Sequence, residues 1–385
     1  MLALTAAALY TPLELVDRPL LLIEDGAIKE VNTRAESGIP LNATHIDFGD
    51  CILAPGLIDI HIHGSAGHDV MHADEGARGR MEEFLARRGV TSYFPTTVAA
   101  PMDSTLRALA NMADAIESAK HNTSRAQPLG IHLEGPFLSH ARRGVHQPDH
   151  LMQPSLAAFE KFWQASRGHI RVMTIAPELR GADEVIDQAA RRGVCVSLGH
   201  TDADLAATKT AIAAGASHAT HTFNAMRPLD HRAPGILGEV LTNASVTADI
   251  IADGIHVHPS IVKLFLQAKG ESAAVLITDA NAAAGMADGT YMLGLLKIEV
   301  KDGKCLSEGK LAGSVLTLDR AVRNVMKFAQ WNLQQAVRTA SLNPATVVGE
   351  QKKGSIRAGA DADLIALSPG GEVKATIVKG EVIQR

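Results

Sequence analysis

The chain has 385 residues, of which 46% are hydrophobic and 4% aromatic, a balance that suits a large α/β core better than an aromatic-rich β-sandwich. Its 37 Lys and Arg residues against 42 Asp and Glu residues give a formal net charge of −5. This mildly acidic, mixed composition argues against nucleic acid or an anionic membrane as the main partner.

The first predicted elements are short β-rich runs over residues 1–54. Residues 1–10 are apolar, but no basic residue precedes Arg18, which indicates a first strand rather than a signal peptide. An Asp25-Gly26 step between two apolar runs predicts a hairpin. Residues 362–382 have the same character, with a Pro-Gly-Gly turn at residues 369–371. We therefore predict that residues 1–54 and 346–385 form one small β-sandwich domain.

Residues 55–345 alternate short apolar runs with segments of helical spacing. Eight strands are predicted over residues 57–63, 92–98, 129–133, 170–175, 194–198, 217–221, 246–252 and 274–278. Helical segments include residues 75–88, 104–119, 155–166, 182–192, 202–214, 260–268, 314–328 and 333–340. Eight strand-helix units in about 290 residues predict an α/β fold with a (β/α)₈ TIM-like barrel. We expect a β-hairpin insertion over residues 285–311 and a helix end at Asn343-Pro344.

Cysteine usage and hydropathy bear on the cellular compartment. Cys51, Cys195 and Cys305 are odd in number, far apart and without CxxC spacing, so neither a disulfide framework nor a thiolate zinc site is indicated. No run approaches the ~20 apolar residues that span a bilayer. We expect a cytoplasmic protein with no membrane partner.

Candidate functional residues cluster where the predicted strands end, which is where such a barrel builds its active site. His61 and His63 lie two residues apart, so both rings point to the same face of a strand, although two inward histidines at a polar barrel mouth would show the same pattern. Glu134 and His200, taken singly, could cap a turn or a helix. Together with His221 these groups would carry unpaired charge unless a metal organised them.

The side chains of Glu134, His200 and His221 supply three nitrogen and oxygen ligands and leave a position open for water, as in catalytic zinc sites. The metal would lower the pKa of that water, and Asp279 fits as the general base. A second ion bound by His61 and His63, with Glu134 bridging, is compatible with the spacing, which does not decide between one ion and two. The ligand set suits Zn²⁺ and also Fe²⁺.

Several motifs together resemble the amidohydrolase superfamily and, within it, the N-acetylglucosamine-6-phosphate deacetylase family. The matching segments are residues 132–137, 143–146, 199–201, 221–226, 231–235, 253–256, 278–280 and 311–314, with the pair His61 and His63. Residues 354–364 look like the return into the small β-domain of that superfamily. The family uses a glutamate after strand three where many relatives use a carboxylated lysine, and residues 172–177 of the fourth strand contain no lysine.

The resemblance implies hydrolysis of the N-acetyl group of N-acetylglucosamine 6-phosphate. The residues that it places around the substrate are His146, Asn224, Ala225, Arg232, His256 and Gly313. Within that set, the backbone of Asn224-Ala225 is expected to cradle the phosphate and Arg232 to donate to it from the neighbouring subunit of a homodimer. Without the resemblance, an arginine in a loop, such as Arg232, is more often a solvated surface residue.

Two alternatives stay open. The same chemistry could act on another substrate, such as the galactosamine epimer or a cyclic amide, although the missing lysine of the fourth strand counts against cyclic amides. The chain could also be a metal-free barrel that serves as a scaffold or sugar-binding module. Such a protein should have lost a metal ligand or Asp279, and this sequence keeps all of them.

Overall fold

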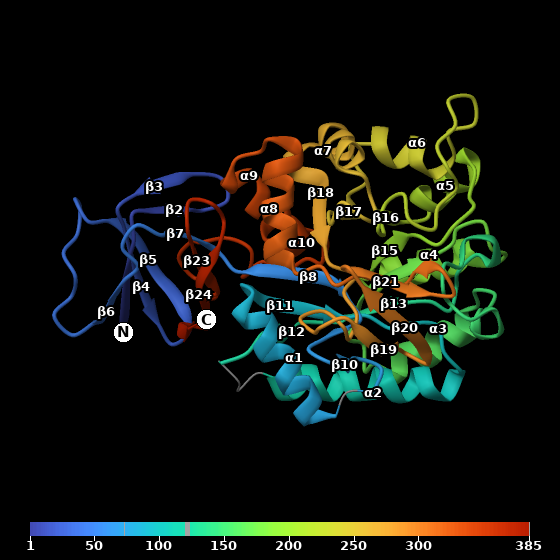
Figure 1. The fold of residues 1–385 in the computed structure, drawn as a ribbon, viewed down its shortest axis with the longest axis horizontal. Coiled ribbons are helices and arrows are strands. Elements are labelled where there is room, and N and C mark those ends of the chain that lie inside the picture. The colour runs from blue at the N-terminus through green and yellow to red at the C-terminus, as the bar shows by residue number, and fades with distance from the viewer. Residues whose placement is uncertain (73, 120–123, 385) are drawn as a thin grey trace.

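The computed structural model describes residues 1–72, 74–119 and 124–384 of an α/β protein. Figure 1 shows a group of strands that contains both chain termini, beside a larger part in which strands and helices alternate. In the described part of the chain, no helix combines the length and the hydropathy needed to cross a bilayer. All three cysteines are unpaired.

Eight parallel strands form the centre of the larger part. They are β8 (Leu57–Ile62), β11 (Val90–Pro95), β13 (Ile131–Glu134), β14 (Ile170–Ile175), β15 (Cys195–Leu198), β16 (Ala216–Ala219), β17 (Ala248–Ile251) and β18 (Ala274–Ile277). Almost every residue of these strands is buried. Near-continuous apolar runs of this kind are typical of parallel strands that are covered on both faces.

Hydrogen bonds link these eight strands in sequence and return from the last to the first. Parallel ladders join β8 to β11, β13 through β14 and β15 to β16, and β17 to β18. Backbone bonds outside these ladders join the remaining neighbours; for example, Thr97 N donates to His132 O, Thr247 N to Ser217 O, and Asp279 N to His61 O. Because all eight strands are parallel, their carboxyl ends meet at one rim. A short strand, β12 (Gln127–Pro128), also pairs with β11.

Helices cover this ring of strands. They are α1 (Glu75–Arg87), α2 (Met102–Ser118), α3 (Leu156–Ala165), α4 (Ala182–Arg191), α5 (Leu205–Ala213), α6 (Gly235–Thr242), α7 (Pro259–Ala273), α8 (Leu318–Ala329), α9 (Leu333–Thr339) and α10 (Leu342–Val347). In α4 the buried residues Ala182, Val185, Ile186 and Ala189 follow the spacing of an amphipathic helix. The expected helix end at Asn343-Pro344 is wrong, because both residues lie in the first turn of α10, where a proline breaks no intrahelical bond.

Five predicted strands, over residues 57–63, 92–98, 217–221, 246–252 and 274–278, run past their observed ends, and two of them lead into His221 and Asp279. The strand predicted over residues 217–221 ends at Ala219, and the one over residues 274–278 ends at Ile277. His221 and Asp279 have φ values of 31° and 49°, in the left-handed region that ends an extended strand. His200, just after β15, has φ 47°. The chain therefore turns at three of the residues whose side chains the sequence selected.

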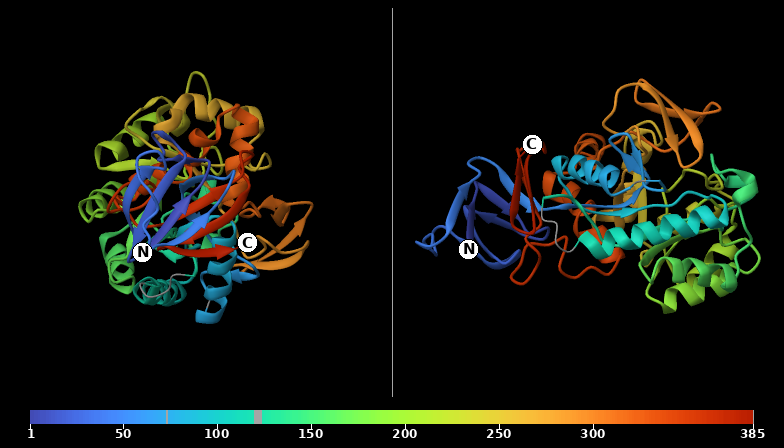
Figure 2. Two further views of the ribbon diagram at one scale, coloured as in Figure 1. Left: turned by 90° about the vertical axis from the view of Figure 1, so that its left-hand side faces the viewer. Right: turned by 90° about the horizontal axis from the view of Figure 1, so that it is seen from below.

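The insertion after β18 is larger than the predicted hairpin. It is a four-stranded antiparallel sheet of β19 (Gly289–Leu293), β20 (Leu296–Lys301), β21 (Lys304–Ser307) and β22 (Lys310–Leu311). In the right-hand view of Figure 2 this sheet, in orange, stands out from the rest of the larger part. In two of its three turns, Asp302-Gly303 and Glu308-Gly309, both residues have positive φ, as in the tight turns of two-residue hairpins. The prediction missed the second turn because glutamate is uncommon there.

Strands from both chain ends share the second group. One sheet has the order β5-β4-β1-β6 and the other β25-β24-β23-β7-β2-β3. The strands are β1 (Leu2–Thr5), β2 (Ala8–Tyr10), β3 (Leu15–Asp17), β4 (Pro19–Glu24), β5 (Ala27–Thr33), β6 (Thr44–Asp47), β7 (Ile52–Pro55), β23 (Leu364–Leu367), β24 (Val373–Val378) and β25 (Glu381–Gln384). Leu4 and Leu21 of the first sheet and Leu53 and Ile377 of the second belong to one buried apolar cluster.

Candidate active site

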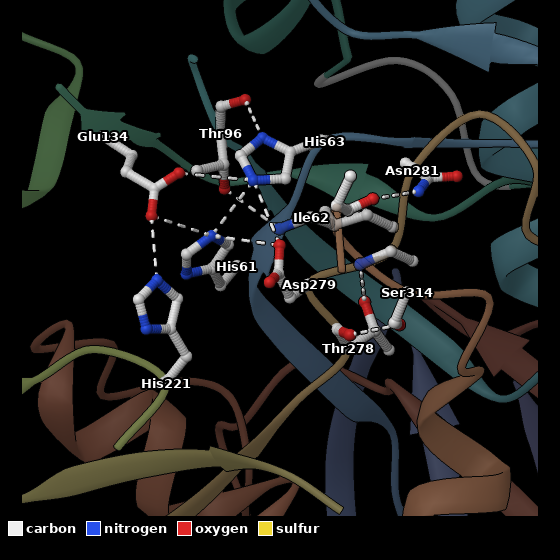
Figure 3. A network of polar contacts seen from close by, with 12 residues as sticks. His61, Ile62, His63, Thr96, Glu134, His221, Thr278, Asp279, Asn281 and Ser314 are labelled. Carbon is white, nitrogen blue, oxygen red and sulfur yellow. Dashed lines mark hydrogen bonds and ion pairs between the residues drawn. The ribbon is translucent and has the colours of Figure 1, made fainter. Parts of the chain in front are cut away.

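Six predicted side chains meet at the rim formed by the carboxyl ends of the strands. His61 and His63 come from β8 and its end, and Asp279 follows β18. The Oδ1 atom of Asp279 lies 3.1 Å from His63 Nε2 and 3.6 Å from His61 Nε2. Figure 3 shows these three side chains, together with Glu134 and His221, pointing toward one another.

A second trio lies against the first. The Oε1 atom of Glu134 lies 3.2 Å from His221 Nε2 and 3.3 Å from His200 Nε2, and the two imidazole nitrogens are 3.1 Å apart. The other carboxylate oxygen, Oε2, is 3.3 Å from His63 Nε2. Glu134 therefore stands between the trio His61, His63 and Asp279 and the pair His200 and His221.

The backbone fixes these groups in place. His200, His221 and Asp279 adopt a left-handed conformation that bulky residues avoid, at a cost on the order of 1–3 kcal/mol each. Compensating hydrogen bonds hold two of them, because His221 N donates to Asp249 and Asp279 N to His61 O. A strained backbone that the surroundings hold in this way is typical of functional sites.

Outer hydrogen bonds orient two of the imidazoles. His63 Nδ1 lies 3.0 Å from Thr96 O, and His200 Nδ1 lies 2.9 Å from Arg142 O. Since a carbonyl oxygen only accepts, each Nδ1 carries a proton, and Nε2 is the ring nitrogen that faces the cluster. Histidines that bind metals are oriented in the same way.

The electrostatics of the cluster fit a divalent cation. Burial favours the protonated acid of Glu134 and Asp279, but the charge and hydrogen bonds of the surrounding histidines outweigh burial and hold the pKa of both carboxyls well below the usual range. Burial lowers the pKa of His221, but Glu134 outweighs it and raises that pKa to about 9. The cluster therefore attracts positive charge into its centre.

The spacing of the ligand atoms agrees with the electrostatics. Ligand atoms around a tetrahedral ion with metal–nitrogen bonds of about 2.0–2.1 Å lie about 3.3 Å apart. The separations among Glu134, His200 and His221 are 3.1–3.3 Å. Glu134 with His200 and His221, and His61 with His63 and Asp279, are two groups that could each hold an ion.

A pocket of about 220 Å³ opens above the cluster. Five of the six predicted substrate-binding residues line it: His146, Asn224, Ala225, His256 and Gly313. Gly313 has φ 61°, and a Cβ atom there would lie 3.1 Å from Asp279 O, so glycine suits this position. Arg232 lies in the loop before α6 and is exposed. The described residues that line this pocket do not include Arg232.

His146 has a defined protonation state in the pocket. Its Nδ1 accepts a hydrogen bond from Ala99 N at 3.2 Å, so the ring proton sits on Nε2, which lies 3.7 Å from Glu134 Oε2. Burial, followed by the charge of His200, lowers the pKa of His146 to about 3. The side chain is therefore a neutral imidazole that can donate one hydrogen bond into the pocket.

Neither His200 nor His256 is the N-cap of the helix that follows it. Asp204 is the N-cap of α5, so His200 is not needed there. His258 is the N-cap of α7, whereas His256 Nδ1 lies 2.7 Å from Asp253 Oδ2 and its ring lines the pocket.

Two buried aspartates beneath the cluster were not among the predicted site residues. Asp249 bonds His221 N and also lies 3.0 Å from His218 Nε2. Asp59 accepts from His61 N at 3.3 Å and from Thr278 Oγ1 at 2.6 Å. Each is an ionisable residue inside an otherwise apolar strand. This departure from the apolar pattern is the sequence signal that could have identified both aspartates.

Parallel strands that bring imidazoles and carboxylates together at the floor of one pocket are typical of the class of metal-dependent hydrolases. The amidohydrolase family matches residues 52–383. The chain belongs to this family, which confirms the predicted resemblance.

Individual relatives match nearly the whole chain. The N-acetylglucosamine-6-phosphate deacetylase of Bacillus subtilis is 38% identical over 378 residues, which cover 97% of this chain and 95% of the relative. The N-acetylgalactosamine-6-phosphate deacetylase of Escherichia coli O157:H7 is 35% identical over 381 residues and 98% of both chains. A mutant of the N-acetyl-D-glucosamine-6-phosphate deacetylase of Mycobacterium smegmatis, in complex with N-acetyl-D-glucosamine-6-phosphate, has a TM-score of 0.93 at 34% identity and covers 100% of this chain and 99% of that chain.

Proposed function

We propose that this chain hydrolyses the N-acetyl group of N-acetylglucosamine 6-phosphate to give glucosamine 6-phosphate and acetate. The observation that carries the proposal is the convergence of Glu134, His200, His221 and Asp279 at the floor of one pocket. Relatives that bear this name are 38% identical over nearly the full length. Amide hydrolysis needs an activated water and a proton shuttle, and this cluster contains groups suited to both.

The proposed architecture follows the same logic. Residues 55–345 would form a (β/α)₈ barrel, supported by the hydrogen-bonded ring of β8 to β18. Residues 1–54 and 346–385 would form a small β-sandwich domain, supported by the two sheets and their common apolar cluster. In such a barrel the catalytic groups lie at the carboxyl ends of the strands.

One or two divalent ions would be held by the cluster. Glu134, His200 and His221 would bind the first, and His61 and His63, with Glu134 between the two positions, would bind a second. Zn²⁺ suits these nitrogen and oxygen ligands best, and Fe²⁺ is compatible. When bound, such an ion acts as a Lewis acid that makes water a stronger nucleophile and the acetyl carbonyl a better electrophile at neutral pH.

Asp279 would move the proton during hydrolysis. Its carboxylate is held ionised, so it can take a proton from the attacking water as the water oxygen bonds to the carbonyl carbon. Asp279 would then return that proton to the amide nitrogen, the C–N bond would break, and acetate and the free amine would leave. The Nε2 proton of His146 would stabilise the negative charge that develops on the carbonyl oxygen.

The sugar phosphate would be held by residues around the pocket. Backbone groups of Asn224 and Ala225 would face the phosphate, and His256 and Gly313 would contact the sugar. Arg232 is exposed in its own chain, which supports donation to the site of a second subunit in a homodimer. Three unpaired cysteines support a cytoplasmic location.

The test combines metal analysis with kinetics. Protein purified without added ions should contain a divalent metal, and it should release acetate from N-acetylglucosamine 6-phosphate. Removal of the metal by a chelator should abolish the reaction, and added Zn²⁺ should restore it. Protein that holds no metal and releases no acetate would favour the scaffold alternative instead.

The galactosamine epimer is the second candidate substrate, because the Escherichia coli relative carries that name at 35% identity. Since the epimers differ by the orientation of one hydroxyl, kcat/KM should be compared on both phosphates. We expect the glucosamine substrate to be preferred, and a preference for the galactosamine epimer would reassign the substrate but keep the chemistry.

A further inference from the structure

One side of the pocket has no role in the proposed chemistry. Val98, Leu293 and Leu296 are aliphatic and line the pocket together with the polar groups described above. We call these three residues the aliphatic wall. Val98 follows β11, and the two leucines flank the Gly294-Leu295 turn between β19 and β20 of the insertion.

The aliphatic wall is fixed next to the cluster. Thr96 O accepts the Nδ1 proton of His63, and Ala99 N donates to His146, so Val98 lies between two residues that bond directly to the site. The insertion sits directly on Val98, because a Cβ atom at Gly294 would come within 2.5 Å of Val98 Cγ2. Only glycine allows this approach, and its φ of 55° also suits the first position of a two-residue turn.

A buried aspartate holds the turn in this position. Asp69 of β10 (His68–Asp69) is 8% exposed, and its Oδ2 accepts a hydrogen bond from Gly294 N at 2.7 Å. Its Oδ1 accepts from Met71 N at 2.8 Å. The turn between β19 and β20 is therefore tied to the segment after β8, and the leucines on either side of it have a defined position.

The Asn224-Ala225 side of the pocket lies opposite Val98. Asn224 and Ala225 follow β16, and Val98 follows β11, four strands away in a ring of eight. A phosphate or a sugar hydroxyl placed against the aliphatic wall would lose its hydrogen bonds to water without replacement. The acetyl methyl group is the one substituent of the substrate that gains from such a surface, and its carbonyl carbon must lie at the cluster.

We propose that Val98, Leu293 and Leu296 form the acyl-binding wall and set the length of acyl group that the enzyme removes. This inference rests on the proposed deacetylase function and deepens it. An acetyl group would fill the space between the cluster and the wall, and longer acyl chains would collide with Leu293 and Leu296. The enzyme would therefore be selective for short N-acyl groups, with the limit set by the insertion.

The experiment compares N-acetyl, N-propionyl and N-butyryl derivatives of glucosamine 6-phosphate on metal-loaded protein. Replacing Leu293 by alanine should raise the butyryl-to-acetyl ratio of kcat/KM by at least ~10-fold, because one methylene in an apolar pocket is worth roughly 10–200-fold in specificity. Met292→Ala is the matched control, since Met292 is its neighbour on β19 but is 45% exposed and points to the other face. That control should keep the wild-type ratio.

Leu296→Ala gives an independent result if Leu293→Ala does not fold. A raised ratio in either variant supports the acyl wall. If the wild-type enzyme removes the acetyl group but both variants keep its ratio, the acyl wall is wrong and the deacetylase function stands. If metal-loaded wild-type protein does not act on the acetyl substrate, the proposed function is wrong and this inference fails with it.

Discussion

Two places where the chain buries charge differ in how that charge is compensated. In the segment that enters β23, Lys353 Nζ lies 2.9 Å from Asp361 Oδ2 and also bonds Asp363. The Lys353 side chain is 6% exposed. Burial acts to lower the pKa of Lys353, but the two carboxylates outweigh burial and raise it, so the lysine stays charged.

The second place is the cluster at the rim of the strands. Its six residues carry carboxylates and imidazoles, and none of them is a lysine or an arginine. Glu134 and Asp279 can be balanced from within the chain only when histidines such as His221 take up protons. Two further imidazole atoms, His61 Nδ1 and His221 Nδ1, are buried without a hydrogen-bond partner among the described residues. A buried charge that the chain itself balances is part of the fold, because removal of its partner would leave it uncompensated. A buried charge that awaits an external cation marks a site of function.

The largest effect is expected from a change of Asp279, the carboxylate assigned to proton transfer. Asp279→Asn should lower turnover by ~10²–10⁴-fold, because an amide cannot shuttle the proton. Steady-state kinetics on N-acetylglucosamine 6-phosphate, with metal analysis of the same sample, measures the effect. The variant should fold and retain the ion bound by Glu134, His200 and His221.

Asp288→Asn is the control, since it makes the same chemical change on an exposed residue of the insertion. It should leave turnover unchanged. Wild-type turnover in Asp279→Asn would remove Asp279 from the reaction.

Local patterns in the sequence were enough to locate the cluster. Each cluster residue lies at or just beyond the end of an apolar run, and parallel strands bring those ends to one rim whatever the loops between them do. His200, His221 and Asp279 could therefore be chosen without knowing any distance. Their left-handed backbone could not be predicted, because it depends on bonds to distant residues such as Asp249.

Features that depend on contacts between distant segments escaped prediction for the same reason. The helix α6 has two glycines in eight residues, and its formation depends on tertiary packing of residues such as Ile236 and Val240. The link between Asp69 and Gly294 joins residues 225 positions apart. No periodicity in the sequence encodes such a pair, although both residues are unusual where they stand.

For Lys353, in contrast to Asp279, a substitution should affect stability and not catalysis. Lys353→Met would leave the carboxylates of Asp361 and Asp363 without their cation, and breaking a buried pair in this way costs about 3–5 kcal/mol. We expect a clear loss of thermal stability with kcat/KM of the folded protein unchanged. Thermal melting measures the loss of stability, and steady-state kinetics below the melting temperature measure kcat/KM.

Lys374→Met provides the matched control in the same group of strands. Lys374 pairs with Glu372 at 2.7 Å, but both side chains are about half exposed, so its loss should cost about 0–1 kcal/mol. Equal melting temperatures for the two variants would show that the buried lysine is not needed to balance its carboxylates.

The smallest effect is expected at Glu82, a buried carboxyl that lies outside the pocket and whose ion pair with Arg78 Nε is 3.6 Å long. Glu82 on α1 accepts a hydrogen bond from Tyr93 Oη at 3.0 Å, and burial raises its pKa to about 7, although Tyr93 and Arg78 oppose the shift. Because the folded chain holds this proton more tightly than the unfolded chain, the contribution of Glu82 to stability is greatest below about pH 4.5 and is lost as the pH rises toward about 7. The loss amounts to about 3 kcal/mol at most.

Glu82→Gln keeps an acceptor for Tyr93 and removes the titration. Relative to wild type, this variant should therefore gain up to about 3 kcal/mol of unfolding free energy between about pH 5 and about pH 8, as denaturant titrations at the two pH values would measure. Glu83→Gln removes the same charge from a neighbouring side chain that is 42% exposed, and its effect should stay within about 0.5 kcal/mol at both pH values. If Glu82→Gln behaves like Glu83→Gln, Glu82 is ionised in the folded protein, and burial alone would not separate structural from functional carboxylates in this chain.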